Sequence, residues 1–217
     1  MNKPVIKFCG VQNLNDLKVV CHSLADYIGF IFAESKRKVD PLLVAEWLEE
    51  VDTTKKIVAV FVNPTDDEIE NVLKHVPVDV IQFHGNETID QIRRIGHSFD
   101  GQLWKALHHH DKTIEEMEHY HSVIDGFVID SRTKGQWGGT GVRFDWDAVP
   151  QYIDLANRLK KICLIAGGVN EKNISELLSL HPQGIDLSSG IEIDQKKSSE
   201  KVYKIEERVL QYVNISR

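Results

Sequence analysis

The sequence predicts a parallel (β/α)8 barrel, because eight short apolar segments alternate with eight segments of helical spacing. The 217 residues divided by eight leave about 27 residues for each strand and helix pair, within the size range of such barrels. The composition is 41% hydrophobic and 27% charged, which is typical of a globular chain with one large core. We therefore expect residues 1–217 to form a single barrel domain.

The first half of the chain contains four expected strands, over residues 5–9, 27–32, 57–62 and 78–83. These apolar runs are too short for amphipathic helices and are typical of buried parallel strands. Apolar residues at intervals of three and four predict helices over 14–24, 42–51, 69–76 and 89–95. Asn13 is a suitable N-cap for the first of these helices, and Pro41 suits the first turn of the second.

The second half repeats the alternation, with expected strands over 102–107, 126–129, 162–166 and 185–187. Helical spacing recurs over 114–121, 149–159, 174–178 and 202–213. The connection 131–145 is the most glycine-rich in the chain. Its glycines are compatible with a mobile lid, and whether the connection closes over a substrate stays open at this point.

Aspartates recur beside the even-numbered strands of this pattern. Asp26, Asp79 and Asp125 stand just before or at the start of three of them, and Asp186 lies in the last one. This faint repeat is typical of duplicated two-unit pieces.

Charge and cysteine usage exclude several classes of partner. The chain has 26 Lys and Arg against 33 Asp and Glu, a net charge of −7, and no basic run interleaved with aromatic residues. We therefore expect no binding to nucleic acid or to an anionic membrane. Cys9, Cys21 and Cys163 form no C-x-x-C pair, which indicates reduced thiols in the cytoplasm. No signal peptide and no membrane-spanning apolar run is expected.

In a (β/α)8 barrel the residues at the carboxyl ends of the strands gather at one face, where such enzymes hold their sites. Gly167 and Gly168 follow the seventh strand, and Ser188, Ser189 and Gly190 follow the eighth. Backbone N–H groups and small hydroxyls at these two ends are suited to a phosphate, although two ordinary turns would have the same composition.

Three further strand-end residues carry chemistry. Cys9 is either a small buried hydrophobe or a thiol that moves a proton. Asp130 either caps a helix or accepts from loop amides, or it is an acid whose pKa partial burial raises. Arg37 either clamps an anion by two parallel hydrogen bonds or is solvated loop charge. The sequence places no lysine or second histidine to stabilise a Cys9 thiolate.

The triplet His108-His109-His110 does not predict a metal site. Consecutive histidines on a loop cannot easily face one ion, and no further ligand follows at the required spacing.

Eight segments resemble, in order and almost end to end, the signature blocks of the phosphoribosylanthranilate isomerase family. They are Lys7-Phe8-Cys9-Gly10, Gly29-Phe30-Ile31-Phe32 with Ser35-Lys36-Arg37, Phe61-Val62-Asn63, Gln82-Phe83-His84-Gly85, Asp130-Ser131, Gly138-Gly139-Thr140-Gly141 with Phe144-Asp145-Trp146, Ala166-Gly167-Gly168, and Asp186-Leu187-Ser188-Ser189-Gly190-Ile191-Glu192. The chain departs from the family pattern at Lys36 and Glu171, where proline is common, and over residues 193–198.

The resemblance implies an Amadori rearrangement of N-(5-phosphoribosyl)anthranilate in tryptophan biosynthesis, with no cofactor and no metal. It implies that Asp130 is the general acid, that Cys9 is the general base and that Arg37 holds the anthranilate carboxylate. It also implies that His84 and Asp186 line or orient the substrate. The implied phosphate ligands are Gly139, Gly141, Gly167, Gly168, Ser188, Ser189 and Gly190.

Two alternatives to this function stay open. One is another phosphosugar aminoaldose-ketose isomerase on the same barrel, although the histidine-pathway enzyme uses two aspartates where this chain has Cys9 and Asp130. The other is a barrel that binds an anionic metabolite without turnover. In each case the expected partner is a phosphorylated small molecule, and the expected assembly is a monomer or a homodimer.

Overall fold

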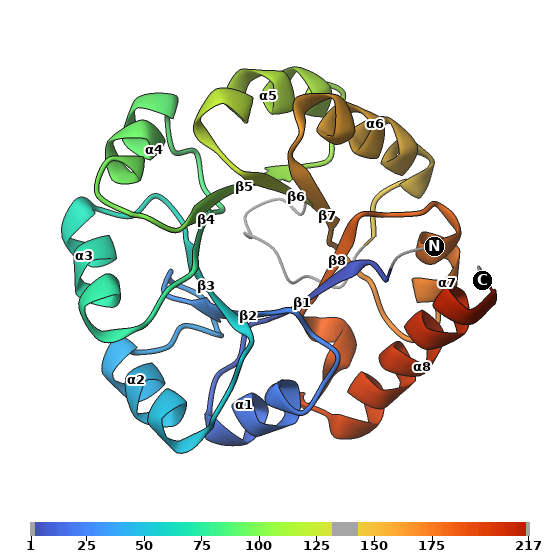
Figure 1. The fold of residues 1–217 in the computed structure, drawn as a ribbon, viewed down its shortest axis with the longest axis horizontal. Coiled ribbons are helices and arrows are strands. Elements are labelled where there is room, and N and C mark those ends of the chain that lie inside the picture. Colours follow the sequence, from blue (N-terminus) through green and yellow to red (C-terminus); the bar gives the residue numbers. More distant parts are fainter. Residues whose placement is uncertain (1–2, 132–142, 216–217) are drawn as a thin grey trace.

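The computed structural model describes residues 3–131 and 143–215. Eight parallel strands form a closed barrel in the order β1-β2-β3-β4-β5-β6-β7-β8, and the helices form a ring around it (Figure 1). The barrel class predicted from the alternation of segments is confirmed.

The eight strands lie where the apolar runs predict them, with ends that differ by no more than two residues. They are β1 (Val5–Cys9), β2 (Tyr27–Ile31), β3 (Lys56–Phe61), β4 (Val80–Phe83), β5 (Gln102–His108), β6 (Gly126–Asp130), β7 (Ile162–Ile165) and β8 (Gly184–Leu187). Parallel pairing of β8 with β1, from Val5↔Gly184 to Phe8↔Leu187, closes the ring.

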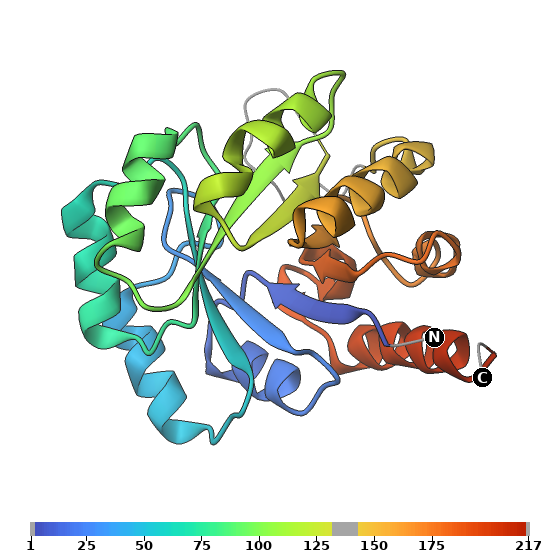
Figure 2. The same ribbon diagram turned by 45° about the horizontal axis from the view of Figure 1, so that its top comes forward.

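The predicted helices are confirmed as well, and each covers the outer face of the barrel between two strands (Figure 2). They are α1 (Leu14–Cys21), α2 (Pro41–Glu50), α3 (Asp66–His75), α4 (Ile89–Gly96), α5 (Thr113–Tyr120), α6 (Val149–Leu159), α7 (Ile174–Ser179) and α8 (Ser199–Ile215), with short 3-10 turns η1 (His121–Val123), η2 (Trp146–Ala148) and η3 (Ser189–Ile191). Within the described ranges, no helix combines the length and apolar character needed to cross a bilayer.

Two apolar layers hold the barrel together. The larger layer lies between strands and helices, and it receives the residues that point outward from the strands, such as Ile6 and Phe8 of β1. The smaller layer fills the barrel interior with inward-pointing residues that include Val58, Trp104 and Leu164. Successive strand residues point alternately into the barrel and toward the helices. The position of a polar residue in its strand therefore decides which of the two layers its side chain enters.

The aspartate repeat is a hydrogen-bonding device between neighbouring strands. Asp26 accepts from the N–H of Ile6 at 2.8 Å, Asp79 from Ile57 at 2.7 Å and Asp125 from Leu103 at 2.9 Å. The fourth member is Gln183, which accepts from the N–H of Cys163 at 2.6 Å. The assignment of Asp186 to this repeat is therefore wrong, because Asp186 lies within β8 and points into the barrel.

The segment that departs from the family pattern forms a small antiparallel hairpin, which the sequence did not predict. Its strands β9 (Glu192–Ile193) and β10 (Lys196–Lys197) are joined through Asp194 and Gln195, whose φ angles are 50° and 64°. Positive φ at both central residues of a two-residue turn matches the twist of a hairpin. The turn brings Glu192 and Lys197 side by side at the mouth of the barrel.

Replacing Asp125 by alanine leaves the N–H of the buried Leu103 without its carboxylate acceptor. We expect Asp125→Ala to lower the free energy of unfolding by about 1 kcal/mol in urea titrations. The exposed Asp100 is the control, since Asp100→Ala is expected to change stability by less than about 0.5 kcal/mol. Equal stability of the two variants would contradict the proposed role of the repeat.

Candidate active site

A cavity of about 440 Å³ opens at the carboxyl ends of the strands. It brings together every predicted site residue that the structure describes: Cys9, Arg37, His84, Asp130, Gly167, Gly168, Asp186, Ser188, Ser189 and Gly190. Gly139, Gly141 and most of the glycine-rich connection 131–145 lie outside the described residues. The volume suits a small-molecule ligand.

Cys9 ends β1 and points into this cavity, with 7% of its surface exposed. Burial raises the pKa of the Cys9 thiol, and the nearby Lys7 ammonium opposes that rise without cancelling it. Gly29 of β2 provides the space for the sulfur, because a Cβ at Gly29 would lie 2.7 Å from Cys9 Sγ. Cys9 is thus a protonated thiol at neutral pH.

Asp130 ends β6 and is also buried, but its pKa is lowered and not raised. Burial alone would raise the pKa, yet interactions with His84, the N–H of Ser131 and His108 outweigh it. The Ser131 N–H donates to Asp130 Oδ1 at 2.7 Å, and His84 Nε2 lies 3.5 Å from Oδ2. The expectation that desolvation raises the Asp130 pKa is therefore wrong, because the sequence does not show these donors.

A buried ion pair between Lys105 and Glu87 holds the turn that carries His84. Lys105 of β5 donates to Glu87 at 3.1 Å and to the carbonyl of Gly85 at 2.6 Å, and the Glu87 carboxylate accepts from the Gly85 N–H. Gln82 contacts His84 Nδ1 at 3.4 Å, which favours the proton on Nε2, the nitrogen that faces Asp130. The turn that carries His84 is thus fixed on both sides.

Arg37 is buried against Glu192 of the β9–β10 hairpin, so the solvated-loop alternative is wrong. Its Nε donates to Glu192 Oε1 at 2.9 Å and its Nη2 to Oε2 at 2.7 Å. Lys197 Nζ binds the same carboxylate at 2.7 Å and the carbonyl of Cys9 at 2.6 Å. A guanidinium has five N–H donors, so this pairing leaves the Nη1–Nη2 edge for another carboxylate.

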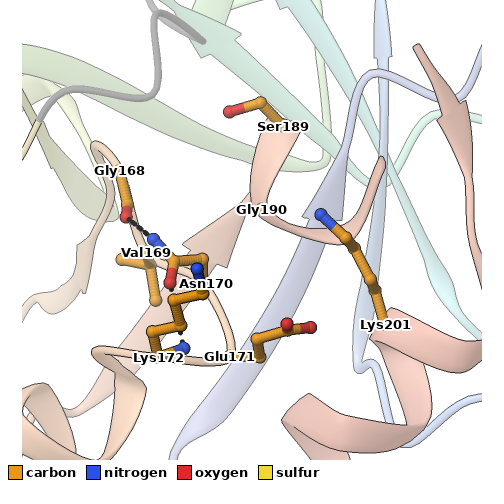
Figure 3. A pocket seen from close by; sticks show the side chains of 8 residues that line it. All are labelled: Gly168, Val169, Asn170, Glu171, Lys172, Ser189, Gly190 and Lys201. Carbon is orange, nitrogen blue, oxygen red and sulfur yellow. Dashed lines mark hydrogen bonds between the residues drawn. The ribbon is translucent and has the colours of Figure 1, made fainter. Parts of the chain in front are cut away.

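The two loops predicted for phosphate lie against each other, because a Cβ at Gly190 would clash with the carbonyl group of Val169. Gly167 has φ 78°, and a Cβ there would lie 2.7 Å from the Ser131 nitrogen and 2.9 Å from Asp130 Oδ1. A smaller hollow of about 290 Å³ lies beside the main cavity and shares Gly168, Ser189 and Gly190 with it (Figure 3). Lys201 reaches from α8 toward Gly190 and places a positive charge beside these loops (Figure 3).

The histidine triplet spreads its side chains among different partners. His109 Nδ1 contacts the Tyr152 hydroxyl at 2.7 Å, and His110 Nε2 contacts Glu116 at 3.1 Å. His108 lies near His84, with ring centroids 5.8 Å apart. Across residues 3–131 and 143–215, no group of three His, Cys, Asp or Glu side chains has an arrangement suited to a metal ion.

Four buried polar atoms around the main cavity have no hydrogen-bond partner among the described residues: Gln82 Oε1, His84 Nε2, Asp186 Oδ1 and Ser188 Oγ. A buried polar atom without a hydrogen bond costs about 1–3 kcal/mol. Their convergence on one cavity is the arrangement expected of a site that receives a polar ligand.

The sequence reasoning missed Lys7, Glu192, Lys197 and Lys201 as members of the site. Lys7 had a usable signal, because it stands two residues before Cys9 in one strand and so faces the same side. Glu192 and Lys197 had none of that kind, because an unpredicted hairpin brings them to Arg37 and Cys9.

The structure is a closed (β/α)8 barrel in which buried titratable side chains surround a cavity at the carboxyl ends of the strands. This arrangement is typical of enzymes that act on small-molecule substrates. Comparison with known proteins narrows this class. A family described as N-(5'phosphoribosyl)anthranilate (PRA) isomerase matches residues 6–208. The chain belongs to this family.

Relatives in sequence and in structure agree with this membership. The N-(5'-phosphoribosyl)anthranilate isomerase of Bacillus licheniformis is 50% identical over 217 residues, and that of Bacillus subtilis is 46% identical over 216 residues, each covering 100% of both chains. The crystal structure of phosphoribosyl anthranilate isomerase from Thermotoga maritima has a TM-score of 0.83 at 26% identity, covering 96% of this chain and 99% of that one.

The lowered pKa of Asp130 depends on His84, so the His84→Asn variant is expected to move that pKa upward. The sign follows because burial, which favours the uncharged acid, then acts with fewer opposing donors. Titration of the Asp130 carboxyl by ¹³C NMR measures the change. The exposed His97 is the control, and an Asp130 midpoint that moves no more in His84→Asn than in His97→Asn would contradict this explanation.

Proposed function

We propose that this chain converts N-(5-phosphoribosyl)anthranilate into 1-(2-carboxyphenylamino)-1-deoxyribulose 5-phosphate, an Amadori rearrangement in tryptophan biosynthesis, by acid/base catalysis without a cofactor. Membership of the PRA isomerase family supports the reaction. The convergence of Gln82, His84, Asp186 and Ser188 on one cavity beside Cys9 and Asp130 is the observation that supports the site. A related phosphoribosyl anthranilate isomerase was solved in complex with reduced 1-(o-carboxyphenylamino)-1-deoxyribulose 5-phosphate.

In this proposal the two charged ends of the substrate decide its orientation. The loops after β7 and β8, with Gly167, Gly168 and residues 188–190, take the phosphate, and Gly139 and Gly141 remain predicted ligands. Arg37 takes the anthranilate carboxylate on the guanidinium edge that Glu192 leaves available. The ribose then spans the cavity between Cys9 and Asp130.

The reaction needs one proton delivered and one removed. Asp130 donates a proton to the ribose ring oxygen, the bond from that oxygen to C1 breaks, and the anilino nitrogen lone pair forms a C1=N Schiff base. The Cys9 thiolate then removes the proton from C2, the C–H electron pair forms the C1=C2 bond, and the C1=N π pair returns to nitrogen, which gives an enolamine. Ketonisation then adds a proton at C1 and releases the proton of the C2 hydroxyl, which gives the aminoketose.

In the free site, Cys9 and Asp130 have the opposite protonation states to those that the proposed reaction needs. The raised pKa of Cys9 and the lowered pKa of Asp130 leave the proton on the thiol, whereas catalysis starts with it on the carboxylate. One proton shared by the pair gives a constant active fraction between the two pKa values. The kcat/KM profile therefore has a plateau that falls at acid pH with Asp130 protonation and at alkaline pH with Cys9 ionisation.

We also propose that residues 1–217 act as one domain, as a monomer or a homodimer, in the cytoplasm. The three cysteines are free thiols, which supports a reducing compartment. One solved relative from Thermotoga maritima is described as a dimeric enzyme from which monomers were generated. Light scattering after size exclusion distinguishes the two assemblies.

Removal of either member of the acid/base pair is expected to abolish most of the activity. Cys9→Ala and Asp130→Ala should each lower kcat by about 10²–10⁴-fold, the range of general acid–base catalysis. The assay follows the loss of anthranilate fluorescence from enzymatically generated substrate. Cys21→Ala is the control, because Cys21 lies in α1 outside the cavity.

Two results would contradict the proposed roles or the proposed reaction. Near wild-type kcat in Cys9→Ala or Asp130→Ala would show that the altered residue is not the base or the acid. Binding of a reduced product analogue by the wild type without turnover would support a binding barrel instead of an enzyme. Complementation of a tryptophan auxotroph that lacks this step tests the reaction in cells.

Arg37→Met should raise KM by about tenfold or more and change kcat less, because the charged partner of the substrate carboxylate is lost. Arg93→Met, on the exposed face of α4, is the matched control. Steady-state kinetics with varied substrate concentration separate the two constants. An Arg37→Met enzyme with unchanged KM would place the carboxylate elsewhere.

A further inference from the structure

Lys7 is a buried charge inside the barrel that the proposed reaction has not used. It stands two residues before Cys9 in β1, so both side chains point inward, and its side chain is 0% exposed. Its register partners are Tyr27 of β2 and Asp186 of β8. An ammonium group at such a depth is costly unless a negative group lies beside it.

The carboxylate of Asp186 is that negative group. Lys7 Nζ donates to Asp186 Oδ2 at 2.9 Å, and the other carboxylate oxygen, Oδ1, has no partner among the described residues and lies at the cavity. Burial alone would lower the pKa of Lys7, but Asp186 and Cys9 together keep it raised. Lys7 is therefore a permanent positive charge between a carboxylate and a thiol.

We propose that Lys7 is a positioning residue that stabilises the thiolate form of Cys9, and that Asp186 sets the strength of this effect by sharing the ammonium. The inference rests on the proposed function, in which Cys9 is the base. When Cys9 takes the C2 proton it becomes a neutral thiol, and Lys7 keeps its own proton throughout. Lys7 thus acts through Cys9 and transfers nothing itself.

The charges around Cys9 come from several elements, and they do not act equally. Among the charged groups, Lys7 has the largest effect on the Cys9 pKa and lowers it. Asp186 of β8 raises that pKa, and Lys197 of β10 lowers it less than Lys7 does. Lys197 donates to the Cys9 carbonyl and to Glu192, and the Glu192 carboxylate offsets part of its charge. From β2, Gly29 presents no charge to the sulfur.

The remaining charged groups of the cavity lie on other walls. Asp130 and His84 come from β6 and from the end of β4, and they face each other at 3.5 Å. Arg37 packs on Gly10, where a Cβ would lie 2.6 Å from the Arg37 Cδ, and its guanidinium is paired with Glu192. Loss of the Lys7 charge should therefore raise the Cys9 pKa, and loss of the Asp186 charge should lower it.

The test measures the ionisation of Cys9 directly, without substrate. The purified full chain is alkylated with iodoacetamide over a range of pH, and mass spectrometry follows the peptide that carries Cys9, separately from Cys21 and Cys163. Lys7→Met should shift the alkylation midpoint to higher pH and slow alkylation at pH 7 by about tenfold. Asp186→Asn should shift the midpoint to lower pH.

Opposite shifts distinguish electrostatics from a loosened barrel, which would expose Cys9 and speed its alkylation in both variants. Lys18→Met, on the exposed face of α1, is the control and should leave the midpoint unchanged. Should Lys7→Met fail to fold, Asp186→Asn alone carries the test, because Lys7 then acts on Cys9 without a competing carboxylate. The kcat/KM of Lys7→Met should fall about tenfold on the plateau.

The results separate this inference from the proposed function. If Cys9→Ala abolishes activity while the midpoint stays unchanged in Lys7→Met and Asp186→Asn, the inference on Lys7 is wrong and the base role stands. If the midpoints shift as expected while Cys9→Ala keeps its activity, Lys7 does control the thiol but Cys9 is not the base. A shift of both midpoints in the same direction also overturns the inference.

Discussion

The pairing of β8 with β1 is the constraint on which the rest of the structure depends. It joins segments separated by about 180 residues and converts an open parallel sheet into a closed barrel. Closure places Lys7 opposite Asp186 and brings the loop after β8 beside the end of β1. Without it, these groups would lie at the two far edges of a sheet and the cavity would have no wall between them.

Closure also explains why so many charges are buried at one end of the molecule. Apolar side chains such as Val58, Trp104 and Leu164 fill part of the barrel interior, and the polar side chains that line the cavity lie at or near the carboxyl ends of the strands. There each charge meets an opposite one, as in Lys7 with Asp186 and Arg37 with Glu192. Such pairs contribute little net stability, but they hold side chains in defined positions around a ligand.

The pKa shifts follow from the same arrangement. Cys9 and Asp130 are both buried, yet burial decides the direction of the pKa shift only for Cys9, because the neighbouring His84 and the Ser131 N–H outweigh it at Asp130. In the proposed reaction Asp130 gives a proton and Cys9 takes one, so the two groups begin in the opposite states. Under that proposal Asp130 must first gain a proton while Cys9 loses one.

The order and boundaries of the strands and helices were predictable, because alternation of short apolar runs with helical spacing is a local property of the chain. The identity of the strand-end residues followed, since parallel strands in a barrel all end at one face. The sequence therefore predicts that Cys9, His84 and Asp130 lie near one another, and the cavity contains all three.

The fold class, the family resemblance and the strand-end groups are readable from local patterns in the chain. The pairing of charges depends on the folded arrangement, because Lys7 meets Asp186 across 179 residues and Arg37 meets Glu192 across 155. The sign of the Asp130 shift and the place of Gln183 in the aspartate repeat were decided in the same way. Electrostatics depends on distances of a few ångströms, and local patterns in a sequence do not contain them.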